Sequence, residues 1–453
     1  MAEDVNAHWA ERDLKVLWHP CTQMKDHALW PPIPIRSGKG VWLEDYEGKR
    51  YIDAISSWWV NLFGHSHPVI NQALKDQVDA LEHVLLAGFT HAPAIELAEA
   101  LVRVSPEGLN HCFYSDNGSS AVEVALKMSY HAWCNQGRPQ KTGFITLENS
   151  YHGETLGALA VGDVALYRET YGPLLMKCLR AESPAHFPRA HGVTAEAHAR
   201  EAFKAMEALL ERHGETTAAV IVEPLVQCAG GMRMYHPVYL SLLKAACERY
   251  QVHLIADEIA VGFGRTGTLF ASEQANITPD FLCLSKGLTG GYMPLAATLT
   301  TRPIYDAFFD DYGSAKAFLH SHSYTGNALA CRVGLASLGL FDQSPVLLEN
   351  QAKAALMAEA VAPLEGHPHV ADIRQQGMIL AIELFKNPKT LEPFAPALRI
   401  GHRVYREALA RGVILRPLGN VIYFMPPYVI TPEEIEQMGR ALIAGVHQAT
   451  HNP

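Results

Sequence analysis

Short apolar runs alternate with amphipathic stretches between residues 68 and 340. The amphipathic stretches at 68–86 and 119–133 have helical spacing. Buried strands are predicted at five short apolar runs: 111–114, 143–147, 218–222, 252–258 and 281–286. Strands that alternate with helices predict a mostly parallel sheet with helices on both faces, and ligands bind such a sheet at the carboxyl ends of its strands.

A different pattern flanks this region on both sides. Residues 35–55 predict short strands around a tight turn at Glu47-Gly48-Lys49. After residue 340, helical segments lead to three short apolar strands, which are expected at 377–383, 413–416 and 420–425. A closing helix is predicted to begin near Thr431 and Pro432, because threonine caps helices well and proline suits the first helical position.

The pattern predicts an α/β protein with three parts. Residues 68–340 are expected to form a large domain around the mostly parallel sheet, and residues 341–453 a smaller α+β domain. The N-terminal segment, residues 1–67, is expected to contribute its strands to the small domain.

Composition narrows the class of protein. Hydrophobic residues make up 48% and charged residues 19% of the 453 residues, which predicts a full core and argues against disorder. The net charge is −10 and no basic stripe stands out, which argues against a nucleic-acid partner. Eight scattered cysteines without a C-x-x-C pair indicate free thiols in a reducing compartment. With no secretory signal and no apolar run long enough to cross a bilayer, we expect a soluble cytoplasmic protein that does not bind membranes.

Asp257 and Lys286 are the strongest candidates for chemistry. Asp257 comes at the end of one apolar run and Lys286 at the end of the next, so both are expected at the same edge of the sheet. Pyridoxal phosphate needs a lysine that bonds to it and an acid that keeps its pyridine nitrogen protonated, and a partly desolvated lysine supplies the neutral amine. The alternative is a strand-end aspartate and a surface lysine that never meet.

A phosphate cradle is predicted at Asp116-Asn117-Gly118-Ser119-Ser120, which follows a strand and opens a helix. Backbone N–H groups at a helix start and serine hydroxyls bind phosphate well. The same residues are also favoured in an ordinary capped helix start, so the motif gains weight only beside a candidate lysine.

Aromatic and histidine side chains have two interpretations each. Tyr151 follows a strand end and could lie flat on a pyridine ring, or it could simply pack in the core. The same choice holds for Trp58 and Trp59. The histidine pairs at 65 and 67 and at 320 and 322 have a spacing that suits a metal, but no carboxylate or cysteine cluster accompanies them, so no metal site is expected.

Two arginines among turn residues, Arg265 and Arg416, could each hold a substrate carboxylate through two parallel hydrogen bonds. For either arginine alone, a structural ion pair is the competing interpretation.

Taken together, these segments resemble the class III pyridoxal-phosphate-dependent aminotransferases. The resemblance covers nearly the whole chain and rests on four motifs in this order: Asp257-Glu258-Ile259, Gly262-Phe263-Gly264-Arg265-Thr266-Gly267, Ser285-Lys286 and Gly326-Asn327. It implies a fold-type I transferase and a homodimer with active sites at the interface.

The resemblance also implies a role for each matching residue in cofactor binding. Lys286 bonds to the cofactor and moves the proton of the substrate, and Asp257 pairs with the pyridinium nitrogen. Tyr151 and Ile259 lie on the two faces of the ring. The phosphate is bound by three further residues, of which the last acts on the partner subunit's cofactor: Gly118, Ser119 and Ser323.

Further marks resemble the members of this class that transfer the amino group of S-adenosyl-L-methionine to 8-amino-7-oxononanoate in biotin biosynthesis. They are Trp18-His19-Pro20-Cys21-Thr22-Gln23-Met24, Ser56-Ser57-Trp58-Trp59, Gly230-Gly231-Met232-Arg233-Met234-Tyr235-His236-Pro237 and Met425-Pro426-Pro427-Tyr428. In this branch Trp58 lines the substrate pocket, Arg416 takes the acceptor's carboxylate, and Arg265 belongs to the same wall. Gly419, in the turn after Arg416, is expected beside the substrate.

Three positions depart from the family pattern. Some members have Tyr in place of Cys21, which leaves the role of Cys21 open, and some have Asp in place of Glu154. Ala229 lies about where glutamate-using members carry a gating Glu, which argues against a glutamate donor.

Other functions remain open at this point. An ω-amino-acid:pyruvate or diamine aminotransferase has the same fold, and lysine could replace S-adenosyl-L-methionine as donor. A nucleotide-binding α/β protein that is not an enzyme would use residues 116–120 for a phosphate, but it would leave Asp257, Lys286 and Arg265 unexplained.

Overall fold

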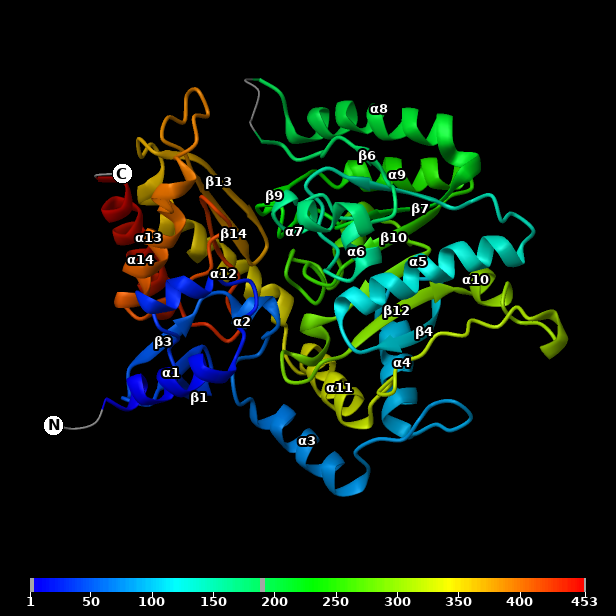
Figure 1. Cartoon of the computed structure of the whole chain (residues 1–453), viewed down its shortest axis with the longest axis horizontal. Coiled ribbons are helices and arrows are strands. Elements are labelled where there is room, and N and C mark those ends of the chain that lie inside the picture. Colours follow the sequence, from blue (N-terminus) through cyan, green and yellow to red (C-terminus); the bar gives the residue numbers. More distant parts are fainter. Residues whose placement is uncertain (1–3, 188–191, 452–453) are drawn as a thin grey trace.

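The computed structural model of the chain describes residues 4–187 and 192–451. A seven-stranded sheet forms its centre, and two smaller sheets and their helices lie to one side of it (Figure 1). The central sheet has the strand order β4 (Leu109–Ser115), β12 (Ala296–Thr301), β11 (Phe281–Leu284), β10 (His253–Asp257), β7 (Thr217–Val222), β5 (Gly143–Leu147) and β6 (Leu179–Ala181). Only β12 runs antiparallel to its neighbours, so the mostly parallel sheet is confirmed.

Helices cover the central sheet on both faces (Figure 1). On one face α5 (Gly118–Asn135) contacts β4, β7, β10, β11 and β12. Five longer helices pack in two groups, α8 (Ala195–His213) with α9 (Val238–Arg249), and α11 (Ala328–Gln343) with α3 (Pro68–Ala80) and α4 (Ala92–Val104). Three short helices complete this region: α6 (Leu156–Ala160), α7 (Ala165–Arg168) and α10 (Arg302–Asp306).

Strands from the N-terminal and C-terminal parts of the chain pair in one small sheet. Its order is β1 (Ile35–Lys39), β2 (Trp42–Asp45), β3 (Arg50–Asp53) and β15 (Val413–Ile414), with β15 parallel to β3. A second small sheet has three strands, in the order β13 (Val370–Gln376), β14 (Ile379–Leu384) and β16 (Val421–Phe424). A two-stranded pair joins β8 (Val226–Gln227) to β9 (Arg233–Met234). The remaining helices are α1 (Val5–Val16), α2 (Ser56–Trp59), α12 (Val346–Val361), α13 (Ile400–Ala410) and α14 (Pro432–His451).

Most of the predicted elements are confirmed, with one helix shorter than expected. The helix predicted at 68–86 ends at Ala80, where the side-chain amide of Gln77 binds the carbonyl of Leu81 and the chain becomes extended. The predicted start of the closing helix is a capping box. Thr431 and Glu434 each accept a hydrogen bond from the other's backbone N–H.

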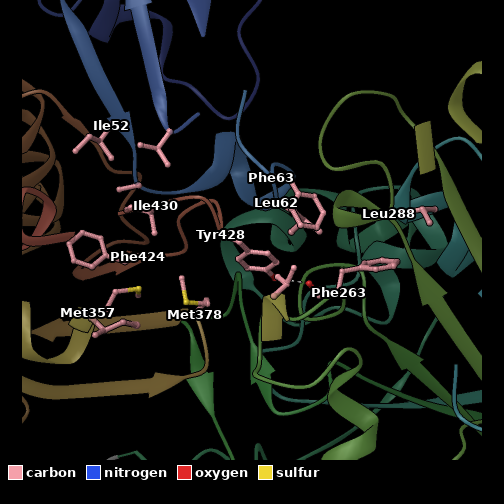
Figure 2. Packing of buried hydrophobic residues seen from close by; sticks show 14 of the residues in the cluster. Ile52, Leu62, Phe63, Phe263, Leu288, Met357, Met378, Phe424, Tyr428 and Ile430 are labelled. Carbon is pink, nitrogen blue, oxygen red and sulfur yellow. Dashed lines mark hydrogen bonds between the residues drawn. The ribbon is translucent and has the colours of Figure 1, made fainter. Parts of the chain in front are cut away.

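A continuous apolar core joins the central sheet to the smaller sheets. Figure 2 shows Leu62 and Phe63 beside Phe263 and Tyr428, and the Tyr428 hydroxyl donates to the carbonyl of Phe263 at 2.6 Å. Residues from three distant parts of the sequence therefore share one core. Within residues 4–187 and 192–451, no helix is long and apolar enough to cross a membrane.

One lysine of the large domain is fully buried elsewhere, beside Trp133. Lys141 is 0% exposed, and its Nζ donates to the carbonyls of Gly214 at 2.6 Å and Thr217 at 3.0 Å. The ring of Trp133 lies 4.8 Å from the same nitrogen. Burial lowers the pKa of Lys141 to about 8, because the charged form loses its hydration.

We expect Lys141→Met to change how stability depends on pH. Between pH 8 and 10.5 the unfolded chain keeps a proton on Lys141 that the folded chain has lost, so the free energy of unfolding of the wild type rises with pH. Relative to the variant, the rise is about 3 kcal/mol, from about 1.4 kcal/mol per pKa unit. Urea unfolding of both proteins across this pH range measures it, and parallel curves would contradict the assignment.

Candidate functional site

A cavity of about 610 Å³ opens at the carboxyl ends of the central strands. It brings together residues that are far apart in the sequence. Seven of the residues expected in the site line it: Trp58, Gly118, Ser119, Tyr151, Asp257, Ile259 and Lys286. The cavity therefore lies where ligands bind in sheets of this kind.

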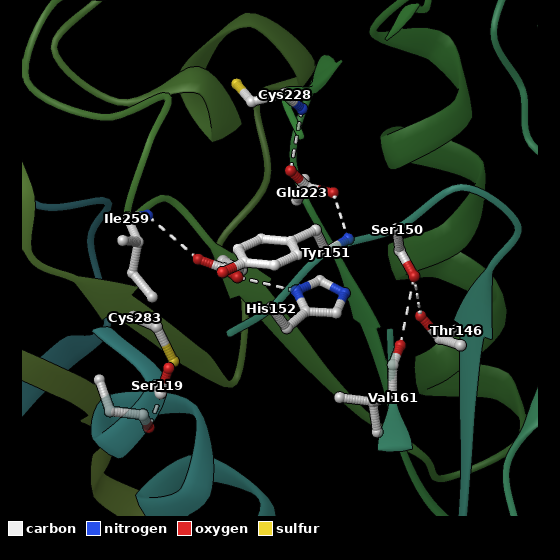
Figure 3. Close-up of polar contacts among 12 residues, drawn as sticks. Ser119, Thr146, Ser150, Tyr151, His152, Val161, Glu223, Cys228, Ile259 and Cys283 are labelled. Atoms are coloured by element: carbon white, nitrogen blue, oxygen red, sulfur yellow. Dashed lines mark hydrogen bonds and ion pairs between the residues drawn. The ribbon is translucent and has the colours of Figure 1, made fainter. Parts of the chain in front are cut away.

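Asp257 ends β10 and is almost fully buried. Its Oδ2 receives a hydrogen bond of 2.7 Å from Nδ1 of His152, and its Oδ1 accepts the backbone N–H of Ile259 at 3.1 Å (Figure 3). These two bonds fix the orientation of the carboxylate. A buried carboxylate that is held in this way can accept a further N–H from a cationic ring nitrogen.

Lys286 follows the neighbouring strand β11 and opens a short 3-10 turn, Lys286–Thr289. Burial lowers the pKa of Lys286, while the carboxylates of Asp257 and Glu223 and the thiol of Cys228 oppose this effect. A larger share of neutral amine is therefore present at neutral pH than in an ordinary lysine. Neutral amine is the form that attacks a carbonyl carbon.

The loop expected to hold phosphate lies between β4 and α5. The side chain of Asn117 caps α5 by accepting the N–H of Ser120 at 3.0 Å, so the capped helix start is present. The helix start and the Ser119 hydroxyl face the same cavity.

Close packing around this loop requires glycine at two positions. A Cβ on Gly118 would come within 2.9 Å of Ile259, and a Cβ on Gly153 within 2.1 Å of the Ser119 hydroxyl. Gly153 also has a φ of +123°, which other residues rarely adopt. The backbone thus approaches Ile259 closely at Gly118 and the Ser119 hydroxyl closely at Gly153.

Tyr151 is fixed at both its backbone and its hydroxyl. Its N–H donates to Oε2 of Glu223 at 2.9 Å, and its hydroxyl donates to Oε1 of Glu154 at 2.9 Å. Tyr151 is therefore held at two points, and Figure 3 shows it between Glu223 and His152.

Two residues of the site were not predicted from the sequence, His152 and Glu223. Both line the cavity and both are buried. Glu223 joins two loops, because its other oxygen accepts the N–H of Cys228 at 3.0 Å. Desolvation and the charge of Asp257 raise the pKa of Glu223 well above its ordinary value. The available signal was position, since Glu223 directly follows β7 and His152 follows Tyr151 in the same loop.

One wall of the cavity is a left-handed turn. Ser56, Ser57, Trp58 and Trp59 have φ values of 51°, 46°, 71° and 74°, although none of them is glycine. Each such residue costs of order 1–2 kcal/mol. Asp53 holds the turn by accepting both the N–H and the hydroxyl of Ser57 at 2.9 and 2.7 Å.

Arg265 lies behind this wall rather than in it. It is 1% exposed and is not among the residues that line the cavity. Its guanidinium donates to three backbone carbonyls, those of Trp59, Asn61 and Pro426, at 3.3, 3.0 and 2.8 Å. The geometry therefore does not bring Arg265 to the cavity as expected, because its two terminal nitrogens donate to backbone carbonyls.

Arg416 lies at the mouth of the cavity. Its guanidinium carbon is 4.1 Å from the centre of the Trp58 ring, and it donates to the carbonyl of Cys21 at 3.3 Å. Both Trp58 and Cys21 line the cavity. Gly419 is an exposed turn residue with a φ of +58° and does not line the cavity.

Ser323 lies on the exposed surface of the single chain. Its carbonyl accepts from Nε2 of His83 at 2.8 Å, and it is not among the residues that line this cavity. The described part of the chain contains no group of three or more His, Cys, Asp or Glu residues that could hold a metal ion.

The residues of the cavity fit pyridoxal phosphate. A buried amine at Lys286, a fixed carboxylate at Asp257 and a helix start with a serine hydroxyl surround one space. These groups match the carbonyl carbon, the ring nitrogen and the phosphate of that cofactor.

Comparison with known proteins agrees with this geometry. The model of the aminotransferase class-III family matches residues 23–445. The chain is 48% identical to the adenosylmethionine-8-amino-7-oxononanoate aminotransferase of Helicobacter pylori over 96% of both chains, and 45% identical to that of Geobacter sulfurreducens over 97% of both.

Two solved structures have the same fold. The adenosylmethionine-8-amino-7-oxononanoate aminotransferase of Methanocaldococcus jannaschii is 38% identical, with a TM-score of 0.92 over 98% of this chain and 99% of that one. The omega transaminase of Pseudomonas jessenii in complex with PMP is 28% identical, with a TM-score of 0.92 over 98% of both chains. The fold-type I architecture expected from the sequence is thereby confirmed, and the chain belongs to the class-III aminotransferases, which use pyridoxal phosphate.

Proposed function

We propose that this chain transfers the amino group of S-adenosyl-L-methionine to 8-amino-7-oxononanoate, giving 7,8-diaminononanoate in biotin biosynthesis. The observation that carries the proposal is the cavity with Lys286 and Asp257 in a chain so similar, over nearly its full length, to relatives that bear the name of this enzyme. The two substrates use one site in turn, the donor before the acceptor.

Lys286 and Asp257 have the central roles in this proposal. Bound pyridoxal phosphate supplies a ring that accepts the electrons left when a proton leaves the substrate. Asp257 holds the ring nitrogen in its protonated form. Lys286 takes the proton from Cα of the donor as a neutral amine and gives it up again as an ammonium. Tyr151 and Ile259 hold the ring between them, and Gly118 and Ser119 bind the phosphate.

The mouth of the cavity is the proposed place of substrate recognition. Arg416 binds the carboxylate of 8-amino-7-oxononanoate, and Trp58 provides an apolar face for its chain. Arg265 supports this wall from behind through the carbonyls that it binds. Gly419, in the turn beyond Arg416, is proposed to lie beside the bound substrate.

We propose a cytoplasmic homodimer in which Ser323 of one subunit reaches the phosphate bound by the other. The exposure of Ser323 supports this assignment, and so do three large exposed apolar residues close to it in the sequence: Tyr312, Leu319 and Tyr324. The cysteines are free, as expected in a reducing compartment. We also propose that the domains divide near residues 67 and 340, since β3 from before the first boundary pairs with β15 from after the second in one small sheet.

A second candidate function is that of an omega transaminase, with an ω-amino acid or a diamine as donor. It is supported by the fold that the chain shares with the omega transaminase of Pseudomonas jessenii. Lysine as donor in the biotin step is a variant of the first proposal.

The visible spectrum of the purified protein tests cofactor and donor together. We expect a yellow protein that loses its colour when S-adenosyl-L-methionine is added alone, because the donor leaves its amino group on the cofactor. Lys286→Ala is the control and should not turn over. A yellow protein that responds to β-alanine, putrescine or lysine, but not to S-adenosyl-L-methionine, would contradict the proposed donor.

Gly153→Ala is expected to weaken cofactor binding, because the added Cβ would come within 2.1 Å of the Ser119 hydroxyl. We expect a loss of affinity for pyridoxal phosphate of roughly tenfold or more, as for a displaced hydrogen bond to a charged group. Gly137→Ala is the matched control. It also has a positive φ, +79°, but nothing within 4 Å of the new Cβ. Titration of both variants with pyridoxal phosphate measures their affinities. Equal affinities would contradict the role of this loop in phosphate binding.

Arg416→Met is expected to raise KM for 8-amino-7-oxononanoate by roughly 10- to 100-fold, the effect of losing a hydrogen bond between charged groups. Arg416→Lys keeps the charge but loses the planar group that stacks on Trp58, so we expect a smaller rise. Steady-state kinetics with the acceptor as the varied substrate measures both. An unchanged KM in the Met variant would remove Arg416 from substrate binding.

A further inference from the structure

The left-handed turn presents two neighbouring tryptophans to two different cations. Trp58 faces Arg416 at the mouth of the cavity, at 4.1 Å from its guanidinium carbon. Trp59 faces Lys286 inside the cavity, and the distance from Nζ to the centre of the ring is 5.2 Å. Here the left-handed backbone places the rings of two adjacent residues against two different cations.

Trp59 is far more tightly held than Trp58. It is 4% exposed, whereas Trp58 is 36% exposed. The Trp59 indole N–H donates to the hydroxyl of Tyr423 at 3.0 Å, and its carbonyl accepts from Arg265. Tyr423 belongs to β16 and is itself 1% exposed. The Trp59 side chain is therefore held at its indole N–H, and its backbone at the carbonyl.

We propose that the face of Trp59, fixed by Tyr423, is the resting place of the Lys286 ammonium whenever this lysine is not bonded to the cofactor. The inference rests on the proposed role of Lys286. In that role its amine accepts one proton from the substrate carbon, becomes an ammonium, and returns the proton within the same site. This ammonium must be stabilised, but not so strongly that it can no longer give up its proton.

An aromatic face meets that requirement better than a carboxylate. A strong ion pair would hold the proton and remove the amine from use, whereas a desolvated ring attracts the ammonium moderately. No ion pair of Lys286 is found among the described residues, although charged or titratable groups lie around it. Those that affect it are Asp257, Glu223 and Cys228. Asp257 is already bonded to His152 and to the N–H of Ile259, and Glu223 to two backbone N–H groups.

The proposed role of Trp59 predicts how removal of its ring changes the affinity of Lys286 for a proton. Removal of the ring should disfavour the ammonium, so Lys286 should become a neutral, reactive amine at lower pH. The expected shift is about one pH unit, a tenfold change in the proton affinity, as for a desolvated cation–π contact. A residue that only filled space would have no reason to shift the titration in this direction, because its loss would admit water and favour the charged form.

The test uses the full chain loaded with pyridoxamine phosphate, in which Lys286 is a free amine and no donor is needed. Trace acetylation with acetic anhydride at a series of pH values, followed by mass spectrometry of the Lys286 peptide, gives the midpoint at which the amine becomes reactive. The exposed Lys75 is the internal standard. Trp59→Leu should lower the midpoint by about one unit, and Tyr423→Phe, which keeps the ring and removes its tether, should lower it by less.

Trp58→Leu is the matched control, since it removes a neighbouring ring that faces a different cation. Its midpoint should equal that of the wild type. An unchanged or higher midpoint in Trp59→Leu would overturn the proposal, and so would equal shifts in the two tryptophan variants. If Trp59→Leu does not fold, Tyr423→Phe decides, and a wild-type midpoint there overturns it. Failure of the S-adenosyl-L-methionine reaction would leave these titrations unaffected, so the two proposals fail separately.

Discussion

The electrostatic balance between Asp257 and Lys286 is the constraint on which the site depends. Both groups lie at the carboxyl ends of neighbouring parallel strands, where Asp257 is almost fully buried and Lys286 is half-buried. Burial favours a neutral lysine, and the nearby carboxylates favour a charged one. The site therefore needs a carboxylate that is fixed in place, and the bonds to His152 and to the N–H of Ile259 provide this.

The rest of the structure surrounds this pair with parts that come from elsewhere in the chain. The left-handed turn from the N-terminal region forms one wall, and Arg265 from the large region binds the carbonyls at its end. Tyr423 from the C-terminal sheet holds Trp59 in place. The hydrogen bonds of the buried Arg265 go to backbone carbonyls of two loops, whose dipoles it neutralises. The strain in the turn is offset by these contacts.

The central sheet and the edge where the site lies were predicted well from the sequence, because the pattern of apolar runs and turn residues reflects local backbone structure. Asp257, Lys286, Tyr151 and Gly118 were expected together and lie together. The positions of Arg265 and His152 were not predictable in this way. Whether an arginine donates to substrate or to backbone carbonyls depends on loops more than a hundred residues away, such as that of Pro426.

The conformation of the left-handed turn was also not predictable from the sequence. Nothing in Ser56-Ser57-Trp58-Trp59 favours positive φ, since none of these residues is glycine or asparagine. The local contacts of Asp53 and the long-range contact of Arg265 hold the conformation. The family resemblance suggested that Trp58 lines the pocket, and the geometry adds that its neighbour Trp59 faces the lysine.

The pairing of β3 with β15 has a consequence for the synthesis of the chain. The first sheet lacks its last strand until residues 413–414 have left the ribosome, and Tyr423 follows only afterwards. The cradle around Ser119 and the pair of Asp257 and Lys286 are made long before that. A nascent chain can thus assemble the half of the site that is expected to bind the cofactor while the wall that faces the substrates is still incomplete. Substrate selection is the last property that the growing polypeptide acquires.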